Sequence, residues 1–176
     1  MSQSNAQVSF ETGFHWSDAW VLASVAVGGG LEGARLKDLL AASEIINRAT
    51  LDAAELRDGL GKLLYRGFVE RNGERFVIAG GARLAVERLL AEQRPAYGVM
   101  QFFEELLNVE PYSIDNPHVD GSWPVEGVTD GEVRAATLAY REELHSIWRE
   151  LRSIDKAPLP ERALHLLAMS GKGERV

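Results

Sequence analysis

In the first half of the chain, several successive stretches carry apolar residues at helical spacing. Glycine-rich or polar segments separate these stretches. The first stretch is predicted to be a helix with Ser17 as its N-cap, because Trp16 and Val21 flank that serine in the positions of a hydrophobic staple. Glycines 28–30 end this helix. The second stretch predicts a helix over about Leu36–Asn47, whose start carries no strong capping residue.

A third helix is predicted to begin at Asp52, which stands three residues before Glu55 in the spacing of a capping box. Its inward-facing positions form one stripe: Leu56, Leu60, Leu63, Leu64 and Gly67. Gly59 and Gly61 lie inside this helix, where each glycine costs about 1 kcal/mol of helix stability relative to alanine. Such glycines are expected where a neighbouring backbone comes close.

The dipeptide Asn72-Gly73 follows the third helix and predicts a two-residue type I′ hairpin turn, because both residue types tolerate positive φ. A turn centred on these two residues also sets the register of the flanking strands. The expected cross-strand pairs are Arg71 with Glu74, Glu70 with Arg75, Val69 with Phe76 and Phe68 with Val77. These pairs combine opposite charges or two apolar side chains, so turn and register agree.

The chain beyond the hairpin is predicted to be mainly helical, with helices over residues 82–93 and 99–107. The inward-facing residues of the first of these helices are Leu84, Leu89 and Leu90. A long loop follows at residues 108–131, where three prolines interrupt any periodicity. We expect Tyr112 and Trp123 to hold this loop against the body of the protein.

Residues 130–155 carry the strongest helical pattern of the chain, with core positions spaced alternately four and three residues apart. This heptad predicts a long helix that joins two copies of the chain in a homodimer. The dimerisation candidates are Val133, Tyr140, Leu144, Ile147, Leu151 and Ile154. Together with Thr137 they occupy the a and d positions of the heptad, which form the seam of the helix. The alternative is packing within the chain against Phe102 and Phe103. A last short helix is predicted over residues 160–169.

Three helices, a short extended link near Ala34 and a closing hairpin resemble the winged helix-turn-helix domain of MarR-like and PadR-like transcriptional regulators. The resemblance covers about residues 14–80, and residues 63–70 are similar to the junction between recognition helix and wing in those families. Residues 44–51 are longer than the compact turn usual there, which leaves the placement of the second and third helices open. The resemblance implies duplex DNA as a partner and dimerisation through a helix after the wing, for which residues 130–155 are the candidate.

These patterns predict an α+β protein that is mainly helical, with an N-terminal winged helix-turn-helix and a helical C-terminal region. A chain of 176 residues with 45% hydrophobic residues is large enough for a packed core. The expected parts are a flexible N-terminus at 1–13, the winged helix domain at 14–80, a helical region at 81–170 and a tail at 171–176.

Composition narrows the function classes. The chain contains no cysteine, which excludes disulfides, thiolate nucleophiles and cysteine-bound metals. It has no signal-peptide pattern and no run near the roughly 18 apolar residues of a membrane span, so we expect a cytoplasmic protein without a membrane partner. The net charge of -7 is uneven, because residues 31–90 hold nine acidic and ten basic side chains. Such a neutral domain permits DNA binding but lacks the usual basic surface.

Four basic residues are the candidates for DNA contact: Lys62, Arg66, Arg71 and Arg75. They are expected along the flank of the third helix and in the wing. A helical wheel puts Lys62 on the exposed face of that helix, four residues after Asp58, where the two side chains form an ion pair. The competing interpretation is a solvated surface with cross-strand ion pairs and no DNA contact.

Catalytic patterns are scarce in the sequence. The four histidines are scattered along the chain at His15, His118, His145 and His165. Glu142 and His145 have the spacing of one arm of a carboxylate-bridged di-metal site, but the sequence contains no second copy of that motif. Phosphate-binding glycine loops and the hydrolase nucleophile motif are also missing from it. We therefore expect no enzymatic activity, no metal and no cofactor.

The sequence thus favours a DNA-binding transcriptional regulator of winged helix type. The alternative, from a different class, is a winged helix that serves as a protein-interaction or scaffold module without DNA contact. The exposure and charge of the third helix and the wing distinguish these two functions.

Overall fold

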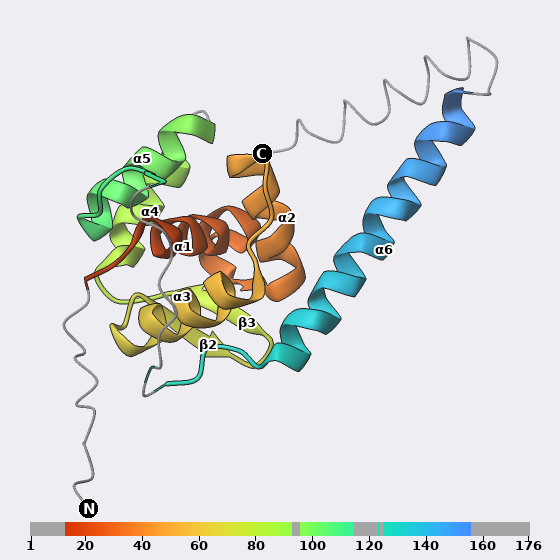
Figure 1. Ribbon diagram of the computed structural model, residues 1–176. Coiled ribbons are helices and arrows are strands. Elements are labelled where there is room, and N and C mark those ends of the chain that lie inside the picture. Colours follow the sequence, from red (N-terminus) through yellow and green to blue (C-terminus); the bar gives the residue numbers. More distant parts are fainter. Residues whose placement is uncertain (1–12, 93–95, 115–122, 124, 156–176) are drawn as a thin grey trace, which may run out of the picture. The chain divides into compact units, whose positions relative to one another are not determined.

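The computed structural model describes residues 13–92, 96–114, 123 and 125–155, which fall into two units divided between Thr137 and Leu138 (Figure 1). Its elements are α1 (Trp16–Gly29), a 3-10 helix η1 (Gly30–Glu32), β1 (Ala34–Arg35), α2 (Leu36–Asn47), α3 (Ala53–Tyr65), β2 (Val69–Asn72), β3 (Arg75–Ile78), α4 (Ala82–Ala91), α5 (Ala96–Leu107) and α6 (Asp130–Asp155). The described chain is therefore α+β and mainly helical, as predicted. The first two turns of α6 belong to the first unit and the rest of α6 to the second.

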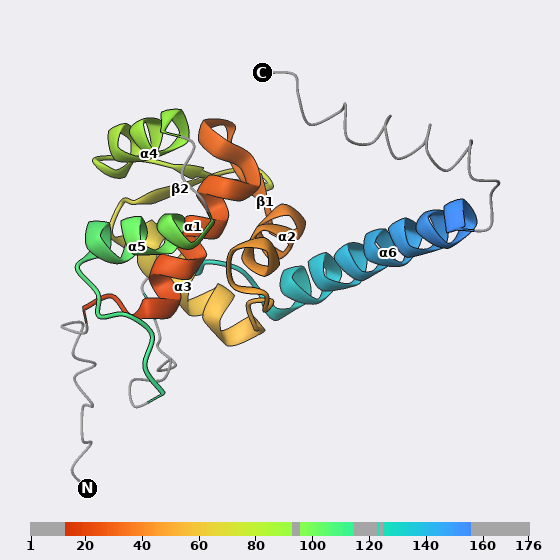
Figure 2. The same ribbon diagram turned by 90° about the horizontal axis from the view of Figure 1, so that it is seen from above.

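Helix α1 is the centre of the first unit, and it contacts α2, α3 and α5 around its circumference (Figure 2). Every residue from Ser17 to Ala26 is buried, because neighbours cover all sides of the helix. The predicted N-cap Ser17 is wrong, since the N-cap is His15. The backbone N–H of His15 donates to the carboxylate of Asp18 at 2.7 Å, and this contact fixes the first turn two residues earlier than the serine signal indicates.

Helices α2 and α3 begin and end close to the predicted residues. The capping box of α3 is reciprocal, because the N–H of Glu55 donates to Asp52 at 2.8 Å and the N–H of Asp52 donates to Glu55 at 2.9 Å. Helix α2 ends at Arg48, whose φ of 54° lies in the left-handed region. The extended link near Ala34 is the short strand β1, which confirms that expectation.

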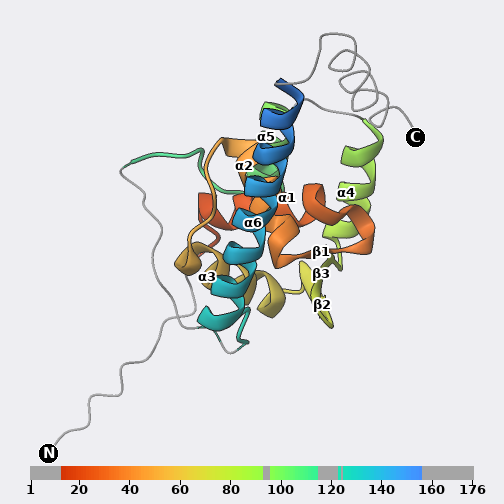
Figure 3. The same ribbon diagram turned by 90° about the vertical axis from the view of Figure 1, so that its right-hand side faces the viewer.

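The three strands form an antiparallel sheet in the order β1-β3-β2, gathered at one edge of the first unit (Figure 3). The hairpin between β2 and β3 is confirmed, but the predicted register is wrong. Asn72 pairs with Arg75, so Gly73 and Glu74 form the two-residue turn in place of Asn72 and Gly73. Gly73 has a φ of 61° and takes the first central position, as glycine does in a type II′ turn.

The new register gives each residue of β2 a partner two positions further along β3 than predicted. Val69 lies opposite Ile78, and Arg71 lies opposite Phe76 rather than Glu74. A shift of two positions leaves every side chain on its original face of the sheet. Apolar alternation therefore does not distinguish the two registers, and tertiary packing selects one of them.

Helix α4 turns a narrower face inward than predicted. Leu84 is 75% exposed and Leu90 is also exposed, whereas Val86 and Leu89 are buried. Leu89 is therefore the one confirmed anchor of the three predicted ones. Helix α5 begins at Ala96, three residues before the expected start.

Helix α6 also begins with a capping box. The N–H and the hydroxyl of Thr129 donate to the carboxylate of Glu132, and the N–H of Glu132 donates back to the hydroxyl oxygen of Thr129. Val133 follows on this first turn and is buried within the first unit. Among the described helices, none combines the length and hydropathy needed to cross a lipid bilayer. Residues 1–12 of the predicted N-terminal segment 1–13, the helix over 160–169 and the tail lie outside the described residues.

Candidate functional site

Helix α3 is the candidate for base contact, and both of its faces are buried. Leu56, Leu60 and Leu63 face the core without measurable exposure. On the opposite face, which the sequence predicts to be exposed, Asp58 is 2% exposed and Lys62 is 3% exposed. The middle of the helix is consequently part of the protein interior and does not form an outer surface.

A covering segment, made of Trp123 and of residues 125–128 just before α6, lies against this second face of α3 (Figure 1). A Cβ atom at Gly61 would lie 3.1 Å from the carbonyl oxygen of Val125 and 3.4 Å from the Trp123 ring. A Cβ atom at Gly127 would lie 2.5 Å from the amide nitrogen of Gly61. The two backbones thus meet glycine to glycine, which confirms the expected close approach at Gly61. Gly59 instead faces the side chain of Val21.

Lys62 forms an ion pair with Asp18 of α1, and this contact replaces the predicted surface pair with Asp58. Both charged side chains are almost completely buried. The Lys62 ammonium also lies 5.1 Å from the ring centroid of Trp123 and 6.0 Å from that of Phe14, within reach of cation–π attraction. The expected exposure of Lys62 is therefore wrong, because a segment distant in sequence covers it. Its amine is not accessible to a phosphate in this arrangement.

Arg71 connects the wing to the same covering segment. Its guanidinium forms an ion pair with Glu132, donates to the carbonyl oxygen of Gly127 at 3.3 Å and lies 5.3 Å from the ring centroid of Phe76. A backbone hydrogen bond from Thr129 and the bond from Arg71 lower the pKa of Glu132 below its ordinary value of 4.5. At neutral pH the carboxylate of Glu132 is charged. It already pairs with the Arg71 guanidinium that a phosphate oxygen would have to contact.

The remaining predicted DNA contacts lie in different surroundings. Arg75 donates to the carbonyl oxygen of Gly33 at 2.6 Å, and its side chain remains exposed. Arg66 lies just after α3, exposed, with its guanidinium 6.0 Å from the Tyr65 ring centroid. The structure thus does not gather the four candidates into one basic surface.

A cavity of about 280 Å³ opens beside the end of α3. Its lining residues are Gly13, Phe14, Lys62, Arg66, Leu107 and Asn108. The charge of Lys62 is already compensated by Asp18, and both α3 and α5 end at this point with the negative pole of the helix dipole. Two cations in the lining therefore do not make the cavity a built anion site.

Sequence reasoning missed most of the residues that cover α3. Helix α6 spans the predicted residues 130–155, but its capping residues Thr129 and Glu132, and the contact of Arg57 with Asp130 at 3.4 Å beside them, were not predicted. Gly127 carries no comparable signal, since its role depends on a contact with a helix more than sixty residues away. Trp123 was expected to pin the loop, and its contact with Lys62 confirms that expectation.

The dimerisation candidates divide by burial. Val133 and Tyr140 are buried, Leu144 and Leu151 are half-buried, and Ile147 is 43% exposed. Val133 is buried within the first unit, and dimerisation through the other candidates stays a prediction. The side chain of Ile154 lies outside the described part of the structure.

Two further observations limit the chemistry of the site. Within the described residues, no three histidine, aspartate or glutamate side chains lie close enough together to hold a metal ion. Comparison with models of protein families gives no match to this chain, and comparisons with curated proteins and with solved structures give no match either.

Proposed function

We propose that residues 14–80 form a winged helix-turn-helix domain. The order α1-β1-α2-α3-β2-β3 and the sheet order β1-β3-β2 support this proposal, because such a domain has three helices and a small antiparallel sheet whose last two strands make the wing. In this assignment α3 is the helix that regulators of this type insert into the major groove.

We further propose that the domain serves protein association rather than DNA recognition. The observation that carries this proposal is the covering segment, Trp123 and residues 125–128, which lies against α3 where Asp58, Gly61 and Lys62 are buried. A recognition helix reads base edges with exposed side chains in a groove about 12 Å wide. Over residues 58–63, where its own chain packs on both sides, α3 presents no such side chains.

The charge of the wing supports the same function. Its exposed positions hold Glu70 and Glu74 beside Arg71 and Arg75, so the wing has no net charge. Glu132 engages Arg71 in addition. Nonspecific affinity for DNA comes from neutralising phosphates, and a balanced wing on a chain of charge -7 supplies little of it.

The second candidate is the DNA-binding transcriptional regulator. The exposure of Arg66 and Arg75 at the end of α3 and in the wing favours it. These two side chains reach solvent and have the charge that phosphate contacts require.

Fluorescence anisotropy with a labelled mixed-sequence duplex distinguishes the two functions. We expect no binding at about 50 mM salt and about 10 μM protein, where a basic winged helix retains nonspecific affinity. The interaction proposal would be overturned by binding whose association constant falls with salt so that its logarithm is linear in the logarithm of the salt concentration. In that event Arg66→Glu with Arg75→Glu should remove most of the affinity, whereas Arg83→Glu on α4 serves as the control and should remove little.

A further inference from the structure

The tip of the hairpin between β2 and β3 joins an asparagine directly to a glycine. Asn72 is the last residue of β2, Gly73 is the first residue of the turn, and both are exposed. A Cβ atom at Gly73 would meet nothing within 4 Å, so the space around this peptide bond is open. Asparagine is one of the thermolabile residues, because its side-chain amide reacts with the backbone nitrogen of the residue that follows it.

The reaction open to such a pair is an intramolecular attack, which gains from the proximity of the two groups. The backbone nitrogen of Gly73 loses its proton and bonds to Cγ of Asn72. The side-chain nitrogen leaves as ammonia, and a succinimide ring is closed. Water then opens the ring: breaking the bond from nitrogen to Cγ leaves aspartate, whereas breaking the bond to the main-chain carbonyl carbon leaves isoaspartate. The balance consumes one water and needs no other reactant.

The attacking nitrogen is available at this pair. Gly73 lies in the turn, and no backbone hydrogen bond within the described part of the chain engages its N–H. The glycine has no side chain, so the carboxamide meets no steric barrier as it approaches. Asn72 closes the hairpin opposite Arg75, and ring closure therefore disturbs only the terminal pair of the two strands.

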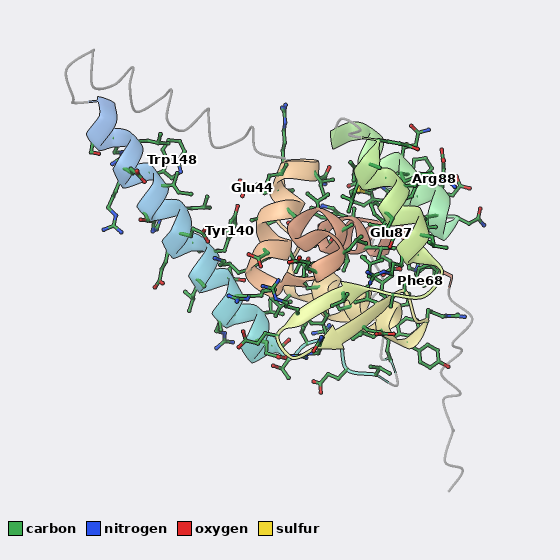
Figure 4. All side chains as sticks on the ribbon, turned by 180° about the vertical axis from the view of Figure 1, so that it is seen from behind. Glu44, Phe68, Glu87, Arg88, Tyr140 and Trp148 are labelled. Atoms are coloured by element: carbon green, nitrogen blue, oxygen red, sulfur yellow. The ribbon has the colours of Figure 1, made fainter. Side chains whose placement is uncertain are left out.

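Asn47, at the end of α2, is a first comparison within the same chain. The residue that follows it is Arg48, whose N–H donates to the carbonyl oxygen of Glu44 at 2.7 Å (Figure 4 labels Glu44). This hydrogen bond has to break before the nitrogen can attack, and the arginine side chain adds bulk beside it. Asn47 is exposed like Asn72, so access to solvent does not distinguish the two.

Asn108, which follows α5, is the second comparison and is also exposed. The N–H of the next residue, Val109, donates to the carbonyl oxygen of Glu104 at 2.9 Å. Valine is branched at Cβ and crowds its own backbone nitrogen. Among the asparagines that the structure describes, Asn72 therefore combines exposure with an unengaged and unhindered nitrogen.

We propose that Asn72 is a site of spontaneous deamidation in the folded protein. The aspartate product gives the neutral wing one negative charge, which lowers its attraction for phosphates further. The isoaspartate product adds one carbon to the main chain at the end of β2 and breaks the pairing of this position with Arg75. This inference goes beyond the proposed association function and does not depend on it.

The full chain, incubated under native conditions in mildly alkaline buffer, allows the conversion at each asparagine to be compared. Chymotryptic cleavage after Phe68 and Phe76 isolates peptide 69–76, which should gain about 1 Da in mass spectrometry as its amide becomes a carboxyl group. We expect this peptide to convert at least about ten times faster than those with Asn47 and Asn108, where a hydrogen bond and a side chain raise the barrier. Conversion should slow in mildly acidic buffer, because the attacking nitrogen has to lose its proton.

Asn72→Gln is the matched control, since the longer side chain closes a larger ring less readily and the position is exposed. Its peptide should keep its mass over the same incubation. Circular dichroism of the incubated chain checks that it stays folded before conversion. Equal rates at the three asparagines would overturn the proposal, as would conversion at Asn72 in urea alone. A product without isoaspartate would also overturn it, because opening of the succinimide yields both isomers.

Discussion

Lys62 has an environment unusual for a lysine on the outer side of a helix. Burying an ammonium is costly unless an opposite charge compensates it, and here Asp18 provides that charge while Phe14 and Trp123 supply aromatic faces. Asp18 also accepts the N–H of His15, so the same carboxylate caps α1 and neutralises a residue of α3. One residue pair thereby connects the start of α1 to the last turn of α3.

Removing one member of this pair should be strongly destabilising, because it leaves the other charge buried. We expect Lys62→Met to lower the free energy of unfolding by about 3–5 kcal/mol in urea denaturation. The control is Arg83→Met, which breaks the exposed pair with Glu87 and should cost less than about 0.5 kcal/mol. A loss for Lys62→Met as small as that of the control would contradict the burial of the pair.

The packing of the covering segment, Trp123 and residues 125–128, on α3 decides which part of this helix is exposed. The backbones of the two segments approach at Gly61 and Gly127, where any side chain atom would meet main-chain atoms of the other segment. Arg57 with Asp130 and Arg71 with Glu132 add ion pairs at the edges of this contact. The covering segment therefore packs closely on α3, and the outer face of residues 58–62 is not available to DNA.

Gly127→Ala should disturb this packing. Its Cβ would lie 2.5 Å from the Gly61 nitrogen and 2.8 Å from the Arg57 carbonyl oxygen, so the segment must move outward. Because overpacking costs about 1–3 kcal/mol, we expect the free energy of unfolding to fall by this amount. Gly81→Ala is the matched control, since a Cβ there meets nothing within 4 Å. If both variants unfold at the same urea concentration, the segment does not pack as described.

For the whole molecule, the division into two units separates two roles. The first unit holds the sheet, α1 to α5 and the covered helix α3, whereas the second consists, in its described part, of α6 from Leu138 to Asp155. The core of the first unit is formed within residues 13–137, as the burial of Phe76, Phe103 and Val128 illustrates. The core of the first unit and the predicted contact between copies therefore involve different parts of the chain.

A protein truncated after Thr137 tests this separation of roles. We expect it to unfold cooperatively in differential scanning calorimetry, with a melting temperature within about 4 °C of the full chain, because the first unit retains its core. Light scattering should report a monomer, since the heptad residues are gone. The untruncated chain at the same molar concentration is the reference. A truncated protein that still associates would place the contact between copies in the first unit.

Local signals in the sequence were sufficient to predict where several helices begin or end and where the hairpin lies. The Asp52 and Glu55 capping box set the start of α3, the glycines at 28–30 ended α1, and a glycine at positive φ marked the hairpin. These signals are readable because each depends on residues a few positions apart. Helix α2, with no strong cap, was still placed correctly by its apolar period.

Tertiary structure alone decided the position of the hairpin turn and the burial of α3. Both hairpin registers satisfy the same alternation of side chains, so packing of Phe76 and Ile78 against the rest of the protein chooses between them. The sequence pattern of α3 predicts an exposed outer face. In the structure this face is buried where Trp123 and residues 125–128 pack against it. Burial is a property of contacts between segments distant in the chain, and neither the period of a helix nor the type of a residue such as Lys62 contains that information.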